Sequence, residues 1–225
     1  MTERQETDKR KITERPQSDH AYSLMFEAAA ERLRKHAPED IARKADVIWD
    51  AENSVMRVPF MNGAVSVEWP SCRLIPVPEN WHALVLLHYL DLADGTLLLS
   101  AAAPDAVPAL MSFRDAPDGM IRGGKFEFTA ARTFERILRG RGPEEIRRAA
   151  VSLGGTETAG KGDLCFVIPV FPRFPVYLHV WLADEDFPAS GRLFLDRSAG
   201  HYLTIEDIVT VGEILLRRLE EQLLQ

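Results

Sequence analysis

The segment from residue 79 to residue 93 most constrains how this chain can fold. It follows Pro78 and reads Trp81-His82-Ala83-Leu84-Val85-Leu86-Leu87-His88-Tyr89-Leu90, so apolar residues fall on nearly every side of a helix. A helix that is apolar all round has to be buried. The segment therefore predicts a central helix that other elements cover, and Asp94-Gly95 marks its end.

The rest of the chain is long enough to provide that cover. A chain of 225 residues lies in the single-domain range, and folding at this size buries roughly 70 to 75% of the unfolded surface. The hydrophobic share of 46% and the charged share of 27% are typical of a globular protein. We expect one α+β domain over residues 19–225 and interpret the polar residues 1–18 as a mobile tail.

Charge and cysteine usage exclude several classes of function. The net charge of -7 disfavours broad binding of nucleic acid, which needs a basic face. No apolar run reaches the length of a membrane span, and the charged first residues do not resemble a signal peptide, so we expect a cytoplasmic protein. Cys72 and Cys165 lack the short paired spacing of metal sites and are predicted to be buried, reduced thiols.

Periodicity and turn residues place the remaining elements. Tyr22, Met25, Phe26, Ala29 and Leu33 have helical spacing, with Ser18 or Asp19 as the expected cap. The proline- and glycine-rich stretch 104–124 predicts a long connection. The other predicted elements are a strand meander over 45–69, a hairpin of helices at 126–139 and 143–153, strands at 163–168, 175–182 and 191–196, and a helix opening at Thr204. Together they predict an antiparallel sheet, or a mixed one, with the central helix buried and the last helix packed on the sheet.

The strand Val176–Leu182 carries the first candidate binding residues. Alternation places Tyr177, His179 and Trp181 on one face, where aromatic rings beside an imidazole can stack on a planar ligand. Arg114 and Arg173 lie in turns rich in proline, and a guanidinium there can clamp an anionic group. The alternatives are a half-buried strand face covered by a helix, and arginines held in structural ion pairs.

Carboxylates around the next hairpin form a candidate metal site. Asp184, Glu185 and Asp186 lie in one loop, Asp196 ends the following strand, and His201 comes shortly after it. Hard cations favour oxygen ligands of this kind, although the spacing matches no calcium loop. A solvated acidic turn and a loop histidine without a role are the alternatives.

Two further groups have structural explanations. Six positions separate His82 from His88, about 240° around a helix, so the two cannot share a metal, and both are predicted to be buried with their polar atoms satisfied. Glu206 and Asp207 follow Thr204 and are explained by capping at the start of the last helix.

The motifs from about residue 22 onward resemble an uncharacterised bacterial and archaeal family, domain of unknown function 3786. The residues that carry the resemblance are Leu86-Leu87-His88-Tyr89-Leu90, Ser112-Phe113-Arg114, Gly154-Gly155, Gly162-Asp163, Phe171-Pro172-Arg173-Phe174-Pro175, Trp181, Asp184 to Ser190, Leu195-Asp196, Tyr202-Leu203 and Glu206-Asp207. The family offers no established activity to carry over. The resemblance implies a setting in anaerobes and a link to corrinoid or one-carbon metabolism, and some relatives carry a cysteine-rich iron–sulfur segment that this sequence lacks.

Three hypotheses for function follow from the sequence. The first is a non-catalytic binding or accessory module, in which Tyr177, His179, Trp181, Arg114 and Arg173 contact a small anionic or planar ligand. The second is a metal-assisted enzyme that uses the carboxylates and His201 as ligands or general bases. The third is an interaction scaffold, which includes self-association into a homo-oligomer. No residue pattern identifies a cofactor.

Overall fold

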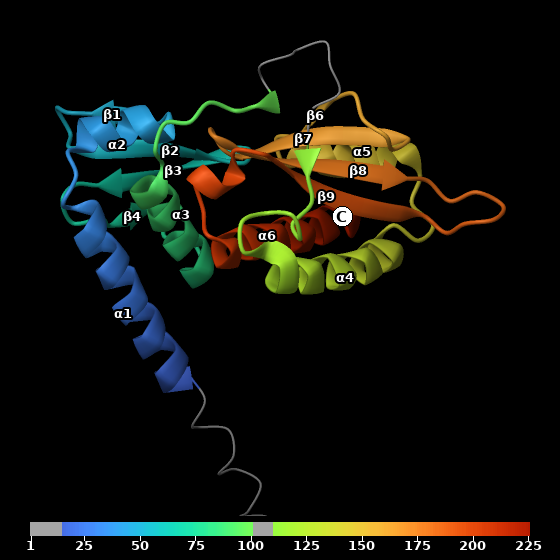
Figure 1. Cartoon of the computed structure of the whole chain (residues 1–225), viewed down its shortest axis with the longest axis horizontal. Helices are drawn as coiled ribbons and strands as arrows, with labels where there is room; N and C mark the ends of the chain where they lie inside the picture. The colour runs from blue at the N-terminus through green and yellow to red at the C-terminus, as the bar shows by residue number, and fades with distance from the viewer. Residues whose placement is uncertain (1–14, 101–109) are drawn as a thin grey trace, which may run out of the picture.

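The computed structural model describes residues 15–100 and 110–225 and has an α+β fold (Figure 1). Its strands form two sheets in which all pairs are antiparallel. The first sheet contains, in spatial order, β1 (Ile48–Asp50), β2 (Val55–Phe60), β3 (Gly63–Glu68) and β4 (Leu74–Ile75). The second contains β5 (Leu110–Met111), β9 (Ser190–Asp196), β8 (Phe174–Trp181), β7 (Leu164–Phe171) and β6 (Thr156–Glu157). The helices are α1 (Arg15–Leu33), α2 (Pro38–Ala45), α3 (Asn80–Leu92), α4 (Gly119–Ile137), α5 (Pro143–Ser152) and α6 (Ile205–Leu223), and Ala199–His201 forms the 3-10 turn η2.

The two sheets lie side by side over one hydrophobic core. The amide of Met61, just after β2, donates to the carbonyl of Val170 in β7 at 3.2 Å. The buried hydrophobic residues of both halves form one contiguous cluster. The antiparallel pairing and the single α+β domain expected from the sequence are therefore confirmed, and the strands are divided between two sheets.

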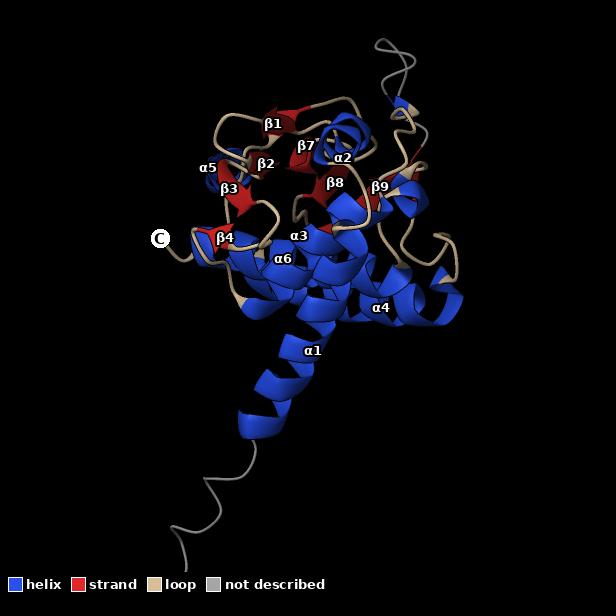
Figure 2. Cartoon of the chain, turned by 90° about the vertical axis from the view of Figure 1, so that its left-hand side faces the viewer, coloured by secondary structure: helices blue, strands red, loops and turns tan. Residues whose placement is uncertain are grey.

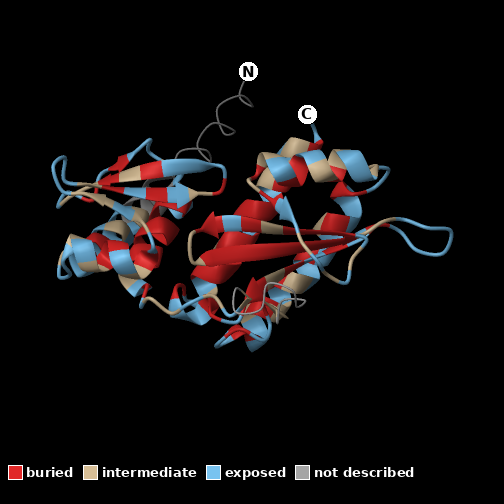
Figure 3. Cartoon of the chain, turned by 90° about the horizontal axis from the view of Figure 1, so that it is seen from above, coloured by how far each residue is buried: buried red, intermediate tan, exposed pale blue. Residues whose placement is uncertain are grey.

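Helix α3 occupies the centre of the structure, as its all-round apolar sequence predicts. Residues 83–87, Tyr89 and Leu90 are all buried. Figure 2 shows α3, α6 and α4 as a layer beneath the strands, and Figure 3 shows that burial continues along the strands of the second sheet. Trp81, which is 55% exposed near the start of the helix, and Leu92 at its end are exposed.

The C-terminal helix α6 begins where the sequence predicts it. The side chain of Thr204 caps the helix and accepts from the amide of Asp207. The apolar stripe from Ile208 to Leu223 is buried beneath the sheets. Helices α4 and α5 each pack against α6 instead of forming the predicted hairpin, because α4 also covers β9 while α5 covers β7. The hairpin prediction is wrong.

The predicted connection over 104–124 is also wrong in its second half. Residues 101–109 lie outside the described part of the chain, β5 follows at Leu110, and α4 already begins at Gly119. Gly123 is inside this helix, where a Cβ atom would lie 2.0 Å from the carbonyl oxygen of Phe113. The glycines that resemble a helix-breaking turn in the sequence therefore let α4 pack against the backbone of the preceding turn.

Other predicted elements agree with the structure within a few residues. The first meander, the strands of the long hairpins and the helix that contains Leu33 are confirmed, whereas the short strands β4 and β6 were not predicted. Helix α1 begins at Arg15, before the expected cap at Ser18 or Asp19. The predicted tail over 1–18 falls mostly on residues 1–14, which are outside the described residues.

The close approach at Gly123 can be tested with a neighbouring glycine as control. We expect Gly123→Ala to lower the free energy of unfolding by about 2 to 3 kcal/mol, because the new methyl group would meet backbone atoms that cannot rotate away. At Gly124 the nearest atoms to a new Cβ are side-chain carbons of Arg114 at 3.8 Å, so Gly124→Ala should raise stability by up to about 1 kcal/mol. Urea denaturation measures both values. Equal effects of the two variants would contradict the packing argument.

A candidate ligand site between α1, α3 and α6

A cavity of about 600 Å³ opens between α1, α3 and α6. Its lining includes Met25 from α1, Trp81 and Val85 from α3, and Ile214 from α6. Trp81, Val85 and His88 are spaced i, i+4 and i+7, so they lie along one face of α3. The cavity thus combines an apolar wall with polar groups from two buried helices.

His88 is a polar residue of the cavity that forms a hydrogen bond between α3 and α6. Its Nδ1 lies 2.8 Å from Oδ1 of Asp207 in the first turn of α6. The other carboxylate oxygen of Asp207 accepts from the hydroxyl of Thr204 at 2.7 Å. Since a carboxylate accepts, Nδ1 carries a hydrogen, and Nε2 has a free lone pair whenever the ring is neutral.

Nε2 of His88 has no hydrogen-bond partner within residues 15–100 and 110–225, and the His88 side chain is 23% exposed. An imidazole held at one nitrogen by a carboxylate has a fixed ring orientation. His88 can therefore accept a hydrogen bond, or a proton, from a molecule in the cavity.

A second histidine lies deeper in the same cavity. His82 is buried, and its Nε2 lies 3.0 Å from a guanidinium nitrogen of Arg217. Arginine only donates, so Nε2 of His82 accepts and the ring is neutral. The same guanidinium nitrogen donates to Glu79 at 2.7 Å. His82 is thus satisfied within the protein, as the sequence predicts, whereas His88 is partly open.

The rim of the cavity is aromatic on one side and ionic on the other. The ring of Trp81 meets that of Tyr22 edge-on at 6.4 Å. On the other side, Arg122 pairs with Glu206 at 2.8 Å and approaches Glu213 at 4.0 Å. The guanidinium groups at the rim already have carboxylate partners, so a strongly anionic ligand would also meet these negative charges.

The strand residues predicted to contact a ligand lie elsewhere and are largely covered. Tyr177 and His179 are buried, and the hydroxyl of Tyr177 donates to Ser100 at 2.7 Å. Trp181 is half-buried, and its indole N–H donates to the carbonyl of Lys161 at 3.2 Å. The segment before residue 101 and the loop before β7 therefore cover this face, instead of a helix.

The two predicted arginines are far from each other in the fold. Arg114 is exposed and lines a smaller cavity of about 260 Å³ beside α4. Arg173 lies in the turn between β7 and β8, and its Nε approaches Asp46 at 3.2 Å without the alignment of a hydrogen bond. The structure does not bring Arg114 and Arg173 together with Tyr177, His179 and Trp181 in one cavity.

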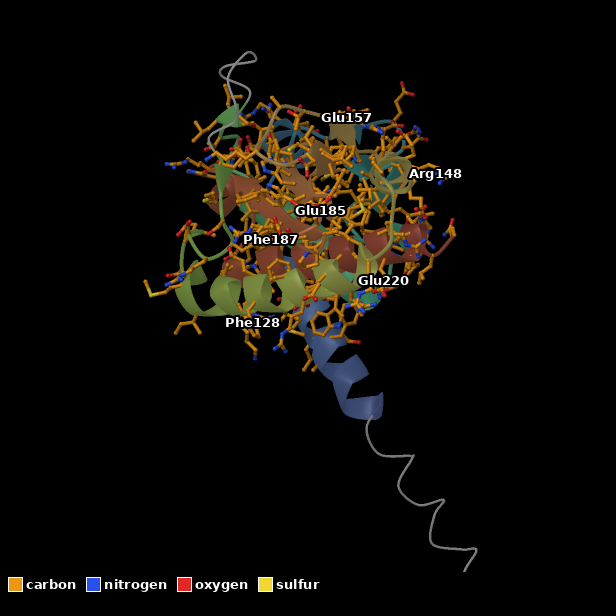
Figure 4. The ribbon with its side chains drawn as sticks, turned by 90° about the vertical axis from the view of Figure 1, so that its right-hand side faces the viewer. Phe128, Arg148, Glu157, Glu185, Phe187 and Glu220 are labelled. Atoms are coloured by element: carbon orange, nitrogen blue, oxygen red, sulfur yellow. The ribbon has the colours of Figure 1, made fainter. Side chains whose placement is uncertain are left out.

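The five predicted metal ligands are also separated. Asp184, Glu185 and Asp186 lie in the loop before β9, which projects from the body in Figure 1, and Glu185 is labelled at this loop in Figure 4. Asp196 and His201 follow the opposite end of β9, roughly 20 Å along the strand. Throughout the described ranges, no group of three or more His, Cys, Asp or Glu side chains is placed to hold a metal.

Three of the predicted metal ligands, Asp184, Asp196 and His201, already form hydrogen bonds within the protein. Asp184 accepts from the amides of Asp186 and Phe187. Asp196 is buried; burial raises the pKa of its carboxyl, but hydrogen bonds from Ser100 and Ser198 outweigh this and lower it. His201 bonds Asp94 at 2.7 Å. Burial raises the pKa of Asp94, but hydrogen bonds from His201 and from Thr96 outweigh this effect and lower the pKa to about 2.

Sequence reasoning missed the pair of His88 and Asp207. The two residues are 119 positions apart, and helix capping already explains Asp207. A signal was present in the spacing of Trp81, Val85 and His88, which places an aromatic ring and an imidazole on the same side of a buried helix.

Burial of His82 has a measurable consequence. Desolvation, with a smaller contribution from Arg217, lowers the pKa of His82 below its ordinary value of 6.5. The unfolded chain therefore binds more protons than the folded chain as pH falls below 6.5, and the free energy of unfolding decreases. We expect His82→Gln to reduce this slope between about pH 6.5 and pH 5, measured by urea denaturation. His36→Gln, at an exposed histidine, serves as control, and an unchanged slope in the His82 variant would contradict the prediction.

Comparison with known proteins identifies a family and nothing more specific. In the described part of the chain, no helix has both the length and the apolar character needed to cross a membrane. No curated protein and no solved structure gave a significant match. The sequence profile of the family described as domain of unknown function (DUF3786) matches residues 37–218, which confirms the resemblance drawn from the motifs. The chain belongs to the DUF3786 family.

Proposed function

We propose that this protein is a small-ligand-binding module whose site is the cavity between α1, α3 and α6. Its ligand has a planar aromatic body and carries a hydroxyl or N–H group. The observation that carries the proposal is the His88–Asp207 pair, which places an oriented ring nitrogen at a cavity with one apolar wall. A donor group on the ligand satisfies that acceptor.

The size and walls of the cavity support a ligand of this kind. Ligand sites in proteins typically have volumes of about 300 to 1,000 Å³, and this cavity has about 600 Å³. The indole of Trp81 is more than half exposed at the rim, where an aromatic ring can stack on it. Leu84, Val85 and Ile214 provide the apolar surface that such a ring buries.

The charges around the cavity favour a neutral ligand over a strongly anionic one. Arg217 is paired with Glu79, and Arg122 with Glu206. An added anion would compete with carboxylates that already neutralise these guanidinium groups. Of the ligand classes that the sequence suggested, the planar one fits these contacts better.

The proposed role is that of a binding or accessory module, without a reaction of its own. The family resemblance implies a setting in anaerobic corrinoid or one-carbon metabolism, and this part of the proposal rests on the resemblance alone. The cavity supports the binding role independently of that setting.

Phenol and anisole provide a direct test, because they differ in the hydroxyl hydrogen. We expect phenol to shift the NMR signals of Trp81 and His88 in the full chain at lower concentration than anisole does, since only phenol can donate to Nε2 of His88. In His88→Phe the advantage of phenol over anisole should disappear, because the phenyl side chain keeps the ring but has no acceptor.

His36→Gln removes an exposed histidine outside the cavity and should keep the preference for phenol. Thermal unfolding of each variant checks that it folds. Signal changes confined to residues away from α1, α3 and α6, or an equal response to phenol and anisole in the wild-type chain, would reject the site.

A further inference from the structure

A thiol and an imidazole lie together beneath the loop that precedes β7, far from the cavity described above. Cys165 in β7 and His179 in β8 are Cα partners in the strand register, so their side chains are on the same face of the sheet. Both are almost fully buried, with 6% and 4% of their surface exposed. The pair is therefore shielded from bulk water.

Both donor atoms face Gly160. A Cβ atom on this glycine would lie 2.4 Å from Sγ of Cys165 and 2.8 Å from Nε2 of His179. Any side chain at position 160 would therefore collide with the sulfur and the nitrogen at once. Glycine at this position therefore lets the loop backbone lie directly against the sulfur and the nitrogen.

The nitrogen of His179 at this point is unsatisfied. Nε2 is buried and has no hydrogen-bond partner in the part of the chain that the structure describes. The imidazole ring lies 4.9 Å from the ring of Phe194 and 6.2 Å from that of Trp181, centroid to centroid, and neither ring replaces a polar partner. A buried polar atom without a partner is costly, so a group that binds the lone pair of this nitrogen would be stabilised here.

Hydrogen bonds hold the covering loop in place. The amide of Thr158 donates to the carbonyl of Cys165 at 3.0 Å, and the indole of Trp181 donates to the carbonyl of Lys161 at 3.2 Å. The amide of Leu182 donates to Asp163 at 2.8 Å. The pair thus lies in a preformed enclosure, which spares a bound ligand the cost of ordering the loop.

We propose that Sγ of Cys165 and Nε2 of His179 bind one soft monovalent cation, copper(I), in two-coordinate geometry. Thiolate and imidazole are both ligands that copper(I) accepts. When the S–Cu bond forms, the thiol proton leaves to solvent, and no electron is transferred. The site goes beyond the ligand cavity and does not depend on it.

Charge balance and ligand number select this cation. One thiolate, one neutral imidazole and one monovalent cation sum to zero charge, whereas a divalent cation would leave a net positive charge among aromatic rings. Zinc takes four ligands in structural sites and three protein ligands in catalytic sites. No group of three candidate ligands exists among the described residues, so a cation that accepts two ligands fits this pair.

Competition with a chromophoric copper(I) chelator tests the site in the full-length chain under anaerobic, reducing conditions. We expect the wild-type protein to withdraw one copper(I) ion per chain from the bicinchoninate complex, seen as loss of the colour of that complex. Cys165→Ser should lose this withdrawal entirely. His179→Phe, which keeps a ring beside Phe194 but has no nitrogen, should let the chelator remove the metal.

Cys72→Ser is the matched control. Cys72 is the other buried cysteine, and its sulfur approaches the carbonyl of Pro70 at 3.7 Å instead of a histidine. This variant should retain one copper ion per chain. Loss of binding in Cys72→Ser, or wild-type binding in Cys165→Ser, would overturn the proposal.

X-ray absorption of the copper-loaded wild-type chain keeps the test decisive if a variant fails to fold. One sulfur and one nitrogen ligand at copper are expected. A copper ion bound by two sulfurs, or failure of the folded wild-type chain to compete with the chelator, would refute the assignment. Phenol binding at the other cavity should be the same with and without copper, so the two proposals fail independently.

Discussion

The fold depends on the burial of Tyr89 at the centre of α3. Its ring stacks on Phe171 with 4.4 Å between ring centroids. Its hydroxyl donates to the carbonyl of Ala45 at 2.6 Å and accepts from the amide of Arg173 at 3.0 Å. A buried hydroxyl without partners costs about 1 to 3 kcal/mol, so these bonds allow a polar atom within the core. They join α3 to α2 and to the turn between β7 and β8, and thus connect the first half of the chain to the second sheet.

The position of Tyr89 also determines where His88 lies. Adjacent residues of a helix are about 100° apart around its axis, so a tyrosine fixed in the core turns His88 toward α6. There the capped first turn of α6 presents Asp207, whose carboxylate lies among free amides at the positive end of the helix. The same rotation places Trp81 at the rim of the cavity, which explains why this aromatic residue is exposed although most of the helix is buried.

The sequence predicted the elements whose apolar pattern is long and regular, including α3, α6 and the strands β7 to β9. It did not predict the start of α4, because Gly123 and Gly124 resemble a turn and the packing of Gly123 against Phe113 is a contact outside the helix. The placement of the two sheets side by side includes a backbone contact between Met61 and Val170, which no local pattern predicts. The pairing of Cys165 with His179 is more accessible from the sequence, because the register of an antiparallel hairpin places the two residues opposite each other.

Three histidines show why residue type alone could not identify a site. His82 is buried, and its Nε2 faces Arg217, which can only donate, so the ring is fixed as a neutral acceptor inside the protein. His88 is bonded to Asp207 through Nδ1, which leaves the opposite nitrogen at a cavity. His179 is buried among aromatic rings with Nε2 beside a thiol and no hydrogen-bond partner within the described residues. For His82 and His88 the hydrogen-bond partner that fixes the role of the ring comes from α6, a distant part of the chain.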